Sequence, residues 1–222
     1  MSIALNISEI LFAGIDMSES KRKKMVNEGS IRKITSKIYT PNMVDSLEDI
    51  VKRNVFRILG FLFPHAVISH RSAFELKPTE AGDIYLTYEY TKNVKLPGLK
   101  VHLMEGHGGG ERDMPFIENL YISSAERRTL ENLQASRSRG GVSKCLPREY
   151  IENYLEKHLQ VNGEKGLNDF RDKARECSLE LGMKEEFNTL NSIIGALLLT
   201  RPVSILTSSG AVARASGEPF DA

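Results

Sequence analysis

Residues 83–104 read DIYLTYEYTKNVKLPGLKVHLM, and this stretch decides the fold class. Apolar or aromatic side chains alternate along DIYLTYEYT, and LKVHLM repeats the same two-residue period, which predicts strands. Pro97 and Gly98 lie between these patterns, where proline presets the first corner of a turn and glycine tolerates a positive φ at the second. Together with AVIS at 66–69, the pattern predicts a small antiparallel sheet over residues 66–104.

Helical periodicity replaces the strand pattern on both sides of this sheet. Before it, SLEDIVKRNVFRILGFLF at 46–63 carries an apolar stripe that predicts a single core helix: Leu47, Ile50, Val51, Val55, Ile58 and Leu59. After it, three stripes predict helices that pack as a bundle: Ile151, Tyr154, Leu155 and Leu159; Leu167, Phe170, Ala174, Cys177 and Leu181; Phe187, Leu190, Ile193, Ile194 and Leu197. Ser123 and Glu126 have capping-box spacing, Pro147 suits a first helical turn and Gly182 a helix end.

The N-terminal segment is predicted to form a helix, a basic helix and a hairpin. SEILFAGI at 8–15 is apolar and compact, and MSESKRKKMVNEG at 17–29 begins with serine caps and closes on a glycine. SIRKITSKIYTP at 30–41 predicts two short strands around a tight turn. A helix followed by a charged hairpin is the arrangement of a reduced winged helix.

The predicted fold class is therefore α+β. We expect a winged-helix-like segment at 1–60, a small α/β sheet domain at 61–134 and a helical bundle at 135–222. ASRSRGGVSK at 135–144 is polar and rich in glycine and serine, which predicts a mobile linker ahead of the bundle.

The charge distribution points to one candidate binding surface. The whole chain has a formal charge of +1, whereas residues 20–57 hold ten Lys or Arg against four Asp or Glu. Exposed cations on a helix and hairpin can bind phosphates by releasing condensed counterions, and a solvated surface is the competing interpretation. The candidate nucleic-acid-binding residues are Lys21, Arg22, Lys23, Lys24, Arg32, Lys33, Lys37 and Tyr39.

Two further motifs carry reactive or anion-binding residue types. In SHRSAFE at 69–75 a serine adjoins a histidine, but no nucleophile elbow or partner acid accompanies them, so a local helix start with Ser69 as cap is favoured. EGHGGGERD at 105–113 matches neither a phosphate loop nor a dinucleotide fingerprint, so a flexible loop is expected. The five histidines show no metal-ligand spacing. No catalytic, metal or cofactor site is predicted.

The cysteines and the first residues bear on location. The two cysteines have no metal-ligand spacing, which suggests a reducing cytoplasm. Cys177 lies on an apolar stripe and should be inert, whereas Cys145 follows the linker and should be the more reactive of the two. The N-terminus has no basic start and carries Asn6 and Glu9 within its apolar run, which argues against a signal peptide. No apolar stretch approaches the length of a membrane span.

Long phrases of the chain resemble the region that precedes the catalytic domain of large bacterial Fic-family proteins. The phrases are LPGLKVHLMEG, PFIENLYISSAERRTLENLQASRSRGG, KCLPREYIENYLEKHLQVNGEKGLNDFRDKARE, LNSIIGALL and GEPFDA, and the resemblance extends over about residues 29–222. The Fic signature itself, His-Pro-Phe followed by a Gly-Asn-Gly-Arg turn, is absent, as is the inhibitory glutamate motif. The resemblance therefore implies no enzyme activity for this chain, and it leaves open a separate regulator or a piece of a larger Fic adenylyltransferase.

The front part, GSIRKITSKIYTPN with AVISHRSAFE, is also similar to AbiEi-type antitoxins of bacterial abortive-infection systems. In that family a winged-helix segment binds the operator of its own operon, and a companion domain counters a nucleotidyltransferase toxin. This resemblance implies a bacterial, cytoplasmic transcription regulator of toxin-antitoxin or phage-defence type. The partners it implies are double-stranded DNA, a toxin or Fic-type protein, and a second copy of the chain.

Overall fold

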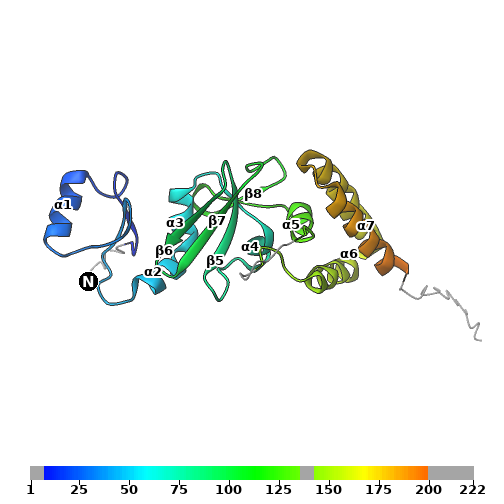
Figure 1. The fold of residues 1–222 in the computed structure, drawn as a ribbon, viewed down its shortest axis with the longest axis horizontal. Helices are drawn as coiled ribbons and strands as arrows, with labels where there is room; N and C mark the ends of the chain where they lie inside the picture. The colour runs from blue at the N-terminus through cyan, green and yellow to red at the C-terminus, as the bar shows by residue number, and fades with distance from the viewer. Residues whose placement is uncertain (1–7, 136–142, 200–222) are drawn as a thin grey trace, which may run out of the picture.

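The computed structural model describes residues 8–135 and 143–199, and its α+β class confirms the sequence prediction. Figure 1 shows three parts in a row: a small N-terminal module in blue, a central sheet in cyan and green, and long helices in yellow and orange. The predicted linker at 135–144 lies largely outside the described residues. Within residues 8–135 and 143–199, no helix combines the length and apolar character needed to cross a bilayer.

The N-terminal module, residues 8–46, is built on a three-stranded antiparallel sheet in the order β1-β3-β2. Its elements are β1 (Leu11–Phe12), α1 (Glu19–Asn27), β2 (Arg32–Thr35) and β3 (Ile38–Thr40). The predicted helix at 8–15 is wrong, because Leu11 pairs with Tyr39 in the sheet and Gly14, at φ +92°, turns the chain back. The strand, helix and hairpin are compatible with a reduced winged helix.

Helix α1 agrees with the predicted basic helix. The Ser18 side chain accepts a hydrogen bond from the backbone N–H of Lys21, and Gly29 follows the helix at φ +67°. No residue of α1 is buried. Met25, which is partly buried, packs against a small core that includes Met17 and Ile31. Most of the helix surface therefore faces solvent.

The predicted core helix at 46–63 is two helices, α2 (Leu47–Arg53) and α3 (Val55–Leu62). They meet at Asn54, whose φ of −112° and ψ of +20° leave the helical region. The Asn54 side chain donates to the carboxylate of Glu9 at 2.6 Å, a tertiary contact that helical periodicity cannot register. Both helices contribute to the main hydrophobic core, which also contains residues of the N-terminal module and of the central sheet.

The central sheet has six strands in the order β6-β7-β5-β4-β9-β8. The strands are β4 (Val67–Ile68), β5 (Asp83–Tyr88), β6 (Lys92–Leu96), β7 (Leu99–Glu105), β8 (Met114–Pro115) and β9 (Tyr121–Ile122). A short 3-10 helix, η1 (Ile117–Asn119), precedes β9.

The sheet is mixed, so the prediction of a purely antiparallel sheet at 66–104 is wrong in that respect. β5 and β7 are parallel, as are β4 and β9. The Pro97–Gly98 turn joins β6 to β7, and β6, which lacks strong apolar alternation, takes the edge of the sheet. β6 follows β5 in the chain but does not pair with it, because β7 lies between the two strands. β7 pairs antiparallel with β6 and parallel with β5.

Four helices complete the described chain: α4 (His70–Glu75), α5 (Ala125–Asn132), α6 (Arg148–Leu181) and α7 (Lys184–Leu199). Gly163, at φ +68°, interrupts α6 between its two predicted stripes, and Gly182, also at +68°, ends it as expected. The three stripes supply the second hydrophobic core. Ser124 caps α5, not Ser123 as the capping box predicts, because the Ser124 hydroxyl accepts from the backbone N–H of Arg127.

Candidate nucleic-acid interface and loop pocket

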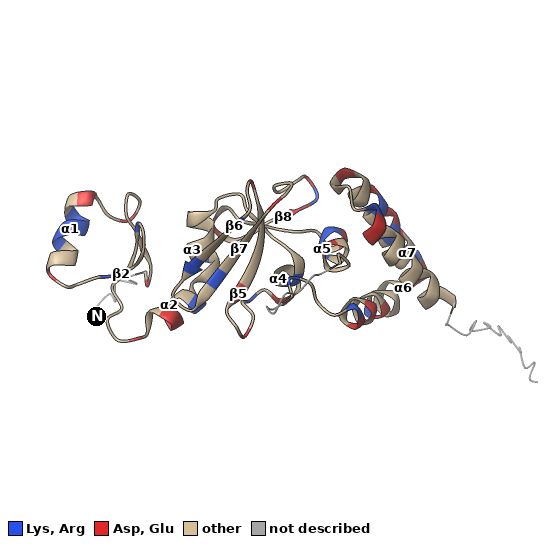
Figure 2. Cartoon of the chain, in the orientation of Figure 1, with Lys and Arg blue, Asp and Glu red and all other residues tan. Residues whose placement is uncertain are grey.

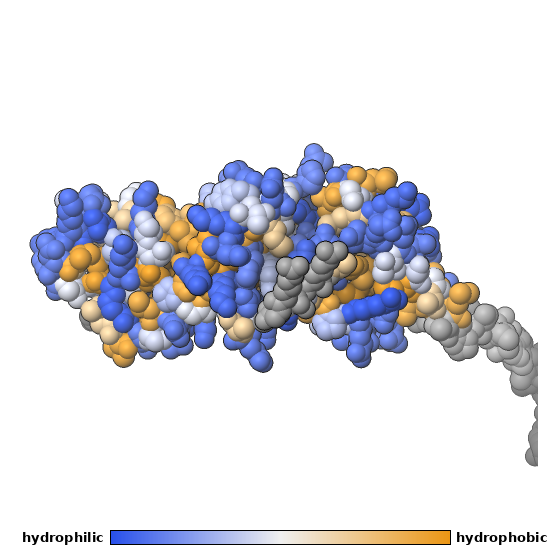
Figure 3. Space-filling view, in the orientation of Figure 1, coloured by the Kyte–Doolittle hydropathy of each residue, from blue (hydrophilic) through white to orange (hydrophobic). Residues whose placement is uncertain are grey.

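Five of the eight predicted nucleic-acid-binding residues are exposed lysines: Lys21, Lys23 and Lys24 on α1, Lys33 on β2, and Lys37 in the β2–β3 turn. Lys24 lies 3.8 Å from Glu28, with both side chains more than half exposed. The other four form no ion pair with any described residue. Figure 2 shows Lys and Arg along α1, and the surface over this helix is largely hydrophilic in Figure 3.

The other three predicted residues stabilise the N-terminal module. Arg22 donates to the hydroxyl of Tyr39 at 3.0 Å and to the carboxylate of Glu19 at 2.9 Å. Arg32 donates to the backbone carbonyls of Asn42 and Asp45, each at 2.6 Å. Tyr39 is 4% exposed, so its ring is not available to stack on a base. These contacts connect α1 to the hairpin and the hairpin to the loop before α2.

Glu9, which the sequence marks only as a charge within an apolar run, connects this module to α2. Glu9 accepts hydrogen bonds from Arg53 at 2.5 Å, from Asn54 at 2.6 Å and from Asn42 at 3.0 Å. The Arg53 hydrogen bond, together with those from the two amides, outweighs partial burial and lowers the pKa of Glu9 to about 2. Glu9 and Arg53 are 44 positions apart, and no local spacing connects them.

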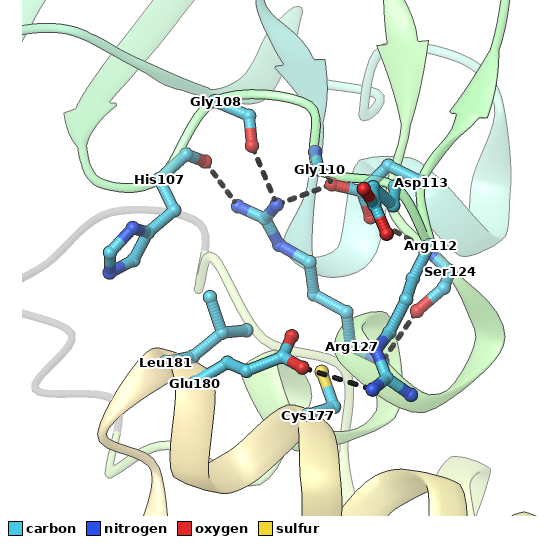
Figure 4. Close-up of a pocket in the computed structure, with 11 residues that line it drawn as sticks. His107, Gly108, Gly110, Arg112, Asp113, Ser124, Arg127, Cys177, Glu180 and Leu181 are labelled. Carbon is cyan, nitrogen blue, oxygen red and sulfur yellow. Dashed lines mark hydrogen bonds and ion pairs between the residues drawn. The ribbon is translucent and has the colours of Figure 1, made fainter.

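A second cluster of charged residues lies inside the molecule, around Arg127 on α5 (Figure 4). Its side chain is 6% exposed and donates to Asp113 at 2.6 Å and to Glu131 at 2.8 Å. It also donates to the backbone carbonyl of His107 at 2.8 Å. Burial alone would lower the pKa of the guanidinium, but the carboxylates of Glu131 and Asp113 raise it above its ordinary value.

Arg127 fixes the glycine-rich loop at 105–113. Asp113, which is buried, accepts from the backbone N–H of Ser124 at 3.0 Å and of Gly110 at 3.1 Å. The loop is thus held by its own aspartate and by Arg127, contacts that the sequence prediction of a flexible loop did not include. The sequence could not reveal this, because the buried arginine lies beyond the next two strands.

A pocket of about 340 Å³ lies between this loop and α6. Arg112 closes one side by pairing with Glu176 at 3.1 Å and Glu180 at 2.9 Å. Cys177 lines the pocket, but burial raises the pKa of its thiol to about 12, so it stays protonated and is a poor nucleophile. Both arginines of the pocket, Arg112 and Arg127, are paired with carboxylates, and this arrangement suits structural support of the loop.

Ser69 and His70 do approach each other, with 3.1 Å between the hydroxyl and Nδ1. Both are buried, so a substrate has no access to the serine. The backbone N–H of His70 donates to Glu131, which replaces Ser69 as the side-chain cap of α4. Burial lowers the pKa of His70, which favours the neutral ring. The local, non-catalytic interpretation of this motif agrees with these contacts.

Cys145, which is predicted to be more reactive than Cys177, is buried as well. Its thiol is 6% exposed and lies 3.3 Å from the backbone carbonyl of Glu131, and burial raises its pKa. Cys177 is buried in the second core, as its apolar stripe predicts. Among residues 8–135 and 143–199, no three His, Cys, Asp or Glu side chains are grouped so that they could hold a metal ion.

Comparison of the chain with protein-family models, with curated proteins and with solved structures finds no match in any of the three. The geometry of the two charged regions and the chemistry of their residues therefore carry the functional inference.

Proposed function

We propose that the N-terminal module binds double-stranded DNA, and that the protein is a non-enzymatic regulator of a bacterial toxin-antitoxin or phage-defence system. One observation supports this most strongly. Helix α1 buries none of its residues, yet it carries three exposed lysines beside a hairpin that carries two more. Because α1 contributes so little to the core, most of its surface is accessible to a binding partner.

Phosphate contacts are the natural chemistry of these side chains. An exposed lysine without a carboxylate partner gains from an anion, and each phosphate contact releases counterions from the duplex. The contact between Arg22 and Tyr39 holds α1 against the hairpin, so the two groups of lysines move as one unit. In this proposal the lysines position the duplex, and polar residues between Ser18 and Asn27 read base edges.

The test reverses four exposed lysines, of which only Lys24 has an ion-pair partner among the described residues, the exposed Glu28: Lys23→Glu, Lys24→Glu, Lys33→Glu and Lys37→Glu in one variant. Arg22 and Arg32 are left unchanged because both support the fold. Fluorescence anisotropy with a labelled duplex of mixed sequence should show a loss of affinity of at least about a hundredfold at low salt.

The matched control places the same charge change on the C-terminal helices, at the exposed residues Lys157, Lys165, Lys173 and Lys184. Thermal unfolding of both variants should resemble that of the unmodified protein. Equal affinity of the three proteins for the duplex would refute the proposal.

A second candidate is a module that docks a toxin or Fic-type enzyme and restrains it. The observation that favours it is the position of α6 and α7 at one end of the molecule, with exposed Val161, Leu179 and Leu199. Co-expression with the protein encoded next to it in the operon, followed by size-exclusion chromatography, tests this candidate. A complex that the four-lysine variant forms as well as the unmodified protein would favour docking, and separate elution would exclude it for that partner.

A further inference from the structure

The outer face of strands β6 and β7 carries a second, separate group of cations. Alternation along β7 directs Leu99, Val101 and Leu103 into the core, whereas Lys100 is exposed on the opposite face. Lys95 of β6 is the direct cross-strand partner of Lys100 and is exposed as well. Like charges directly opposite each other in a sheet are destabilising, so this pair is unfavourable in the isolated protein.

The carboxylate that could neutralise the pair has another partner. Asp83 is the β5 neighbour of Lys100, but its carboxylate accepts from His102 at 2.6 Å. The His102 ring also contacts Asn93 at 2.9 Å and stacks on Tyr85, with 4.8 Å between the centroids and 15° between the planes. This arrangement holds Asp83 to the histidine.

Neither lysine forms an ion pair with any described residue. Glu48 of α2 lies beside Gly98 at the β6–β7 turn, but it makes no ion pair with either ammonium group. Asn93, near the start of β6, is exposed on the same face as the lysine pair. The face therefore presents two unpaired ammonium groups, one amide and part of one imidazole to solvent.

These cations and those of the N-terminal module belong to neighbouring parts of the molecule, since the module lies next to the central sheet in Figure 1. Figure 2 shows Lys and Arg on α1 and on the strands β6 and β7 in one view. Figure 3 shows hydrophilic surface over the same strands, interrupted by smaller apolar areas. A polyanion that is longer than the N-terminal module can therefore reach the neighbouring sheet.

We propose that Lys95 and Lys100 form a second phosphate-contact surface for the same DNA duplex that the N-terminal module binds. This inference rests on the proposed function. A phosphate placed between the two ammonium groups would remove their mutual repulsion and add two charge contacts outside the winged-helix-like module. The consequence is a longer footprint than α1 and its hairpin alone would occupy.

The experiment compares two duplexes of about 12 and 30 base pairs with the full chain and with the Lys95→Thr/Lys100→Thr variant. Threonine suits a strand and removes the repulsion, so the variant should fold at least as stably as the unmodified protein. Its affinity for the long duplex should fall about tenfold, and the slope of log K against log salt should become shallower by about 2. Its affinity for the short duplex should change little, because α1 and the hairpin suffice for that contact.

The outcomes separate this inference from the proposed function. If the N-terminal lysine variant loses affinity and the Lys95→Thr/Lys100→Thr variant retains it on both duplexes, the second surface is refuted and the first stands. If the threonine variant aggregates while its soluble fraction binds normally, the lysines protect the sheet edge instead, and the inference also fails. If the unmodified protein binds neither duplex, both proposals fail together.

Discussion

The N-terminal module and the Arg127 cluster are both rich in charge, but they use it in opposite ways. In the module, lysines face solvent and four of the five have no ion-pair partner among the described residues. In the cluster, one arginine lies between two carboxylates, and all three side chains are at most 6% exposed. Charges that neutralise each other inside the protein determine the fold, whereas unpaired charges on the surface are available for a partner.

The largest expected effect is on stability, and it follows from the buried cluster. Arg127→Met would leave the carboxylates of Asp113 and Glu131 buried without a cation and would release the loop at 105–113. Breaking a buried pair by removing one partner costs about 3–5 kcal/mol. Urea unfolding measures this loss of unfolding free energy.

Arg148→Met is the matched control for that measurement. Arg148 also pairs with a glutamate four residues later, Glu152 at 2.7 Å, but its side chain is 64% exposed. An exposed helical pair of this kind contributes at most about 0.5 kcal/mol. Similar losses of unfolding free energy in Arg127→Met and Arg148→Met would contradict the view that the buried ion pairs stabilise the fold more than the exposed pair does.

An intermediate effect is expected at the junction of the N-terminal module with α2. Glu9→Gln would weaken the contacts with Arg53 and Asn54 and should lower the unfolding free energy by about 1 kcal/mol. The pKa of Glu9 is lowered from 4.5 to about 2 in the folded protein. Its stabilising contribution is therefore complete above pH 4.5 and is lost as the pH falls towards 2.

Urea unfolding of the unmodified protein and of the Glu9→Gln variant between pH 2 and pH 7 measures this dependence. The difference in unfolding free energy should shrink as the pH is lowered below 4.5. A difference that stays constant, or that grows at acid pH, would show that the Glu9 carboxylate does not hold the junction.

The smallest effect is expected from Tyr39→Phe. The change removes the hydroxyl that accepts from Arg22 and keeps the buried ring. We expect a slight fall in the urea midpoint, smaller than that of Glu9→Gln, and a modest loss of duplex affinity because α1 is held less firmly against the hairpin. Duplex affinity as low as that of the four-lysine variant would contradict our interpretation, since it would give Tyr39 a direct role in binding.

Periodicity and turn chemistry predicted the elements whose signals are local. The β6–β7 turn follows from Pro97-Gly98, the division of α6 agrees with two separate stripes, and the basic helix and hairpin lie where their caps and turn residues place them. The α+β class follows from these elements alone.

Features that depend on contacts between distant residues could not be predicted in the same way. The strand β1 replaces a predicted helix because it pairs with β3, and the parallel pairing of β5 and β7 depends on the insertion of one strand between two others. Contacts between distant residues also limit the prediction of the candidate nucleic-acid interface. The charge pattern selects all eight of its residues alike, whereas the intramolecular contacts that distinguish Arg22, Arg32 and Tyr39 from the five exposed lysines become apparent only when the chain is folded.

The salt dependence of duplex binding tests the central claim most directly. The claim is that five lysines contact DNA phosphates: Lys21, Lys23, Lys24, Lys33 and Lys37. Titrations at several salt concentrations would compare the unmodified protein with a variant in which all five are changed to glutamine. We predict a steep negative slope of log K against log salt that becomes shallower by about 4.5 in the variant. Equal slopes for the two proteins, or no duplex binding at low salt, would contradict the account.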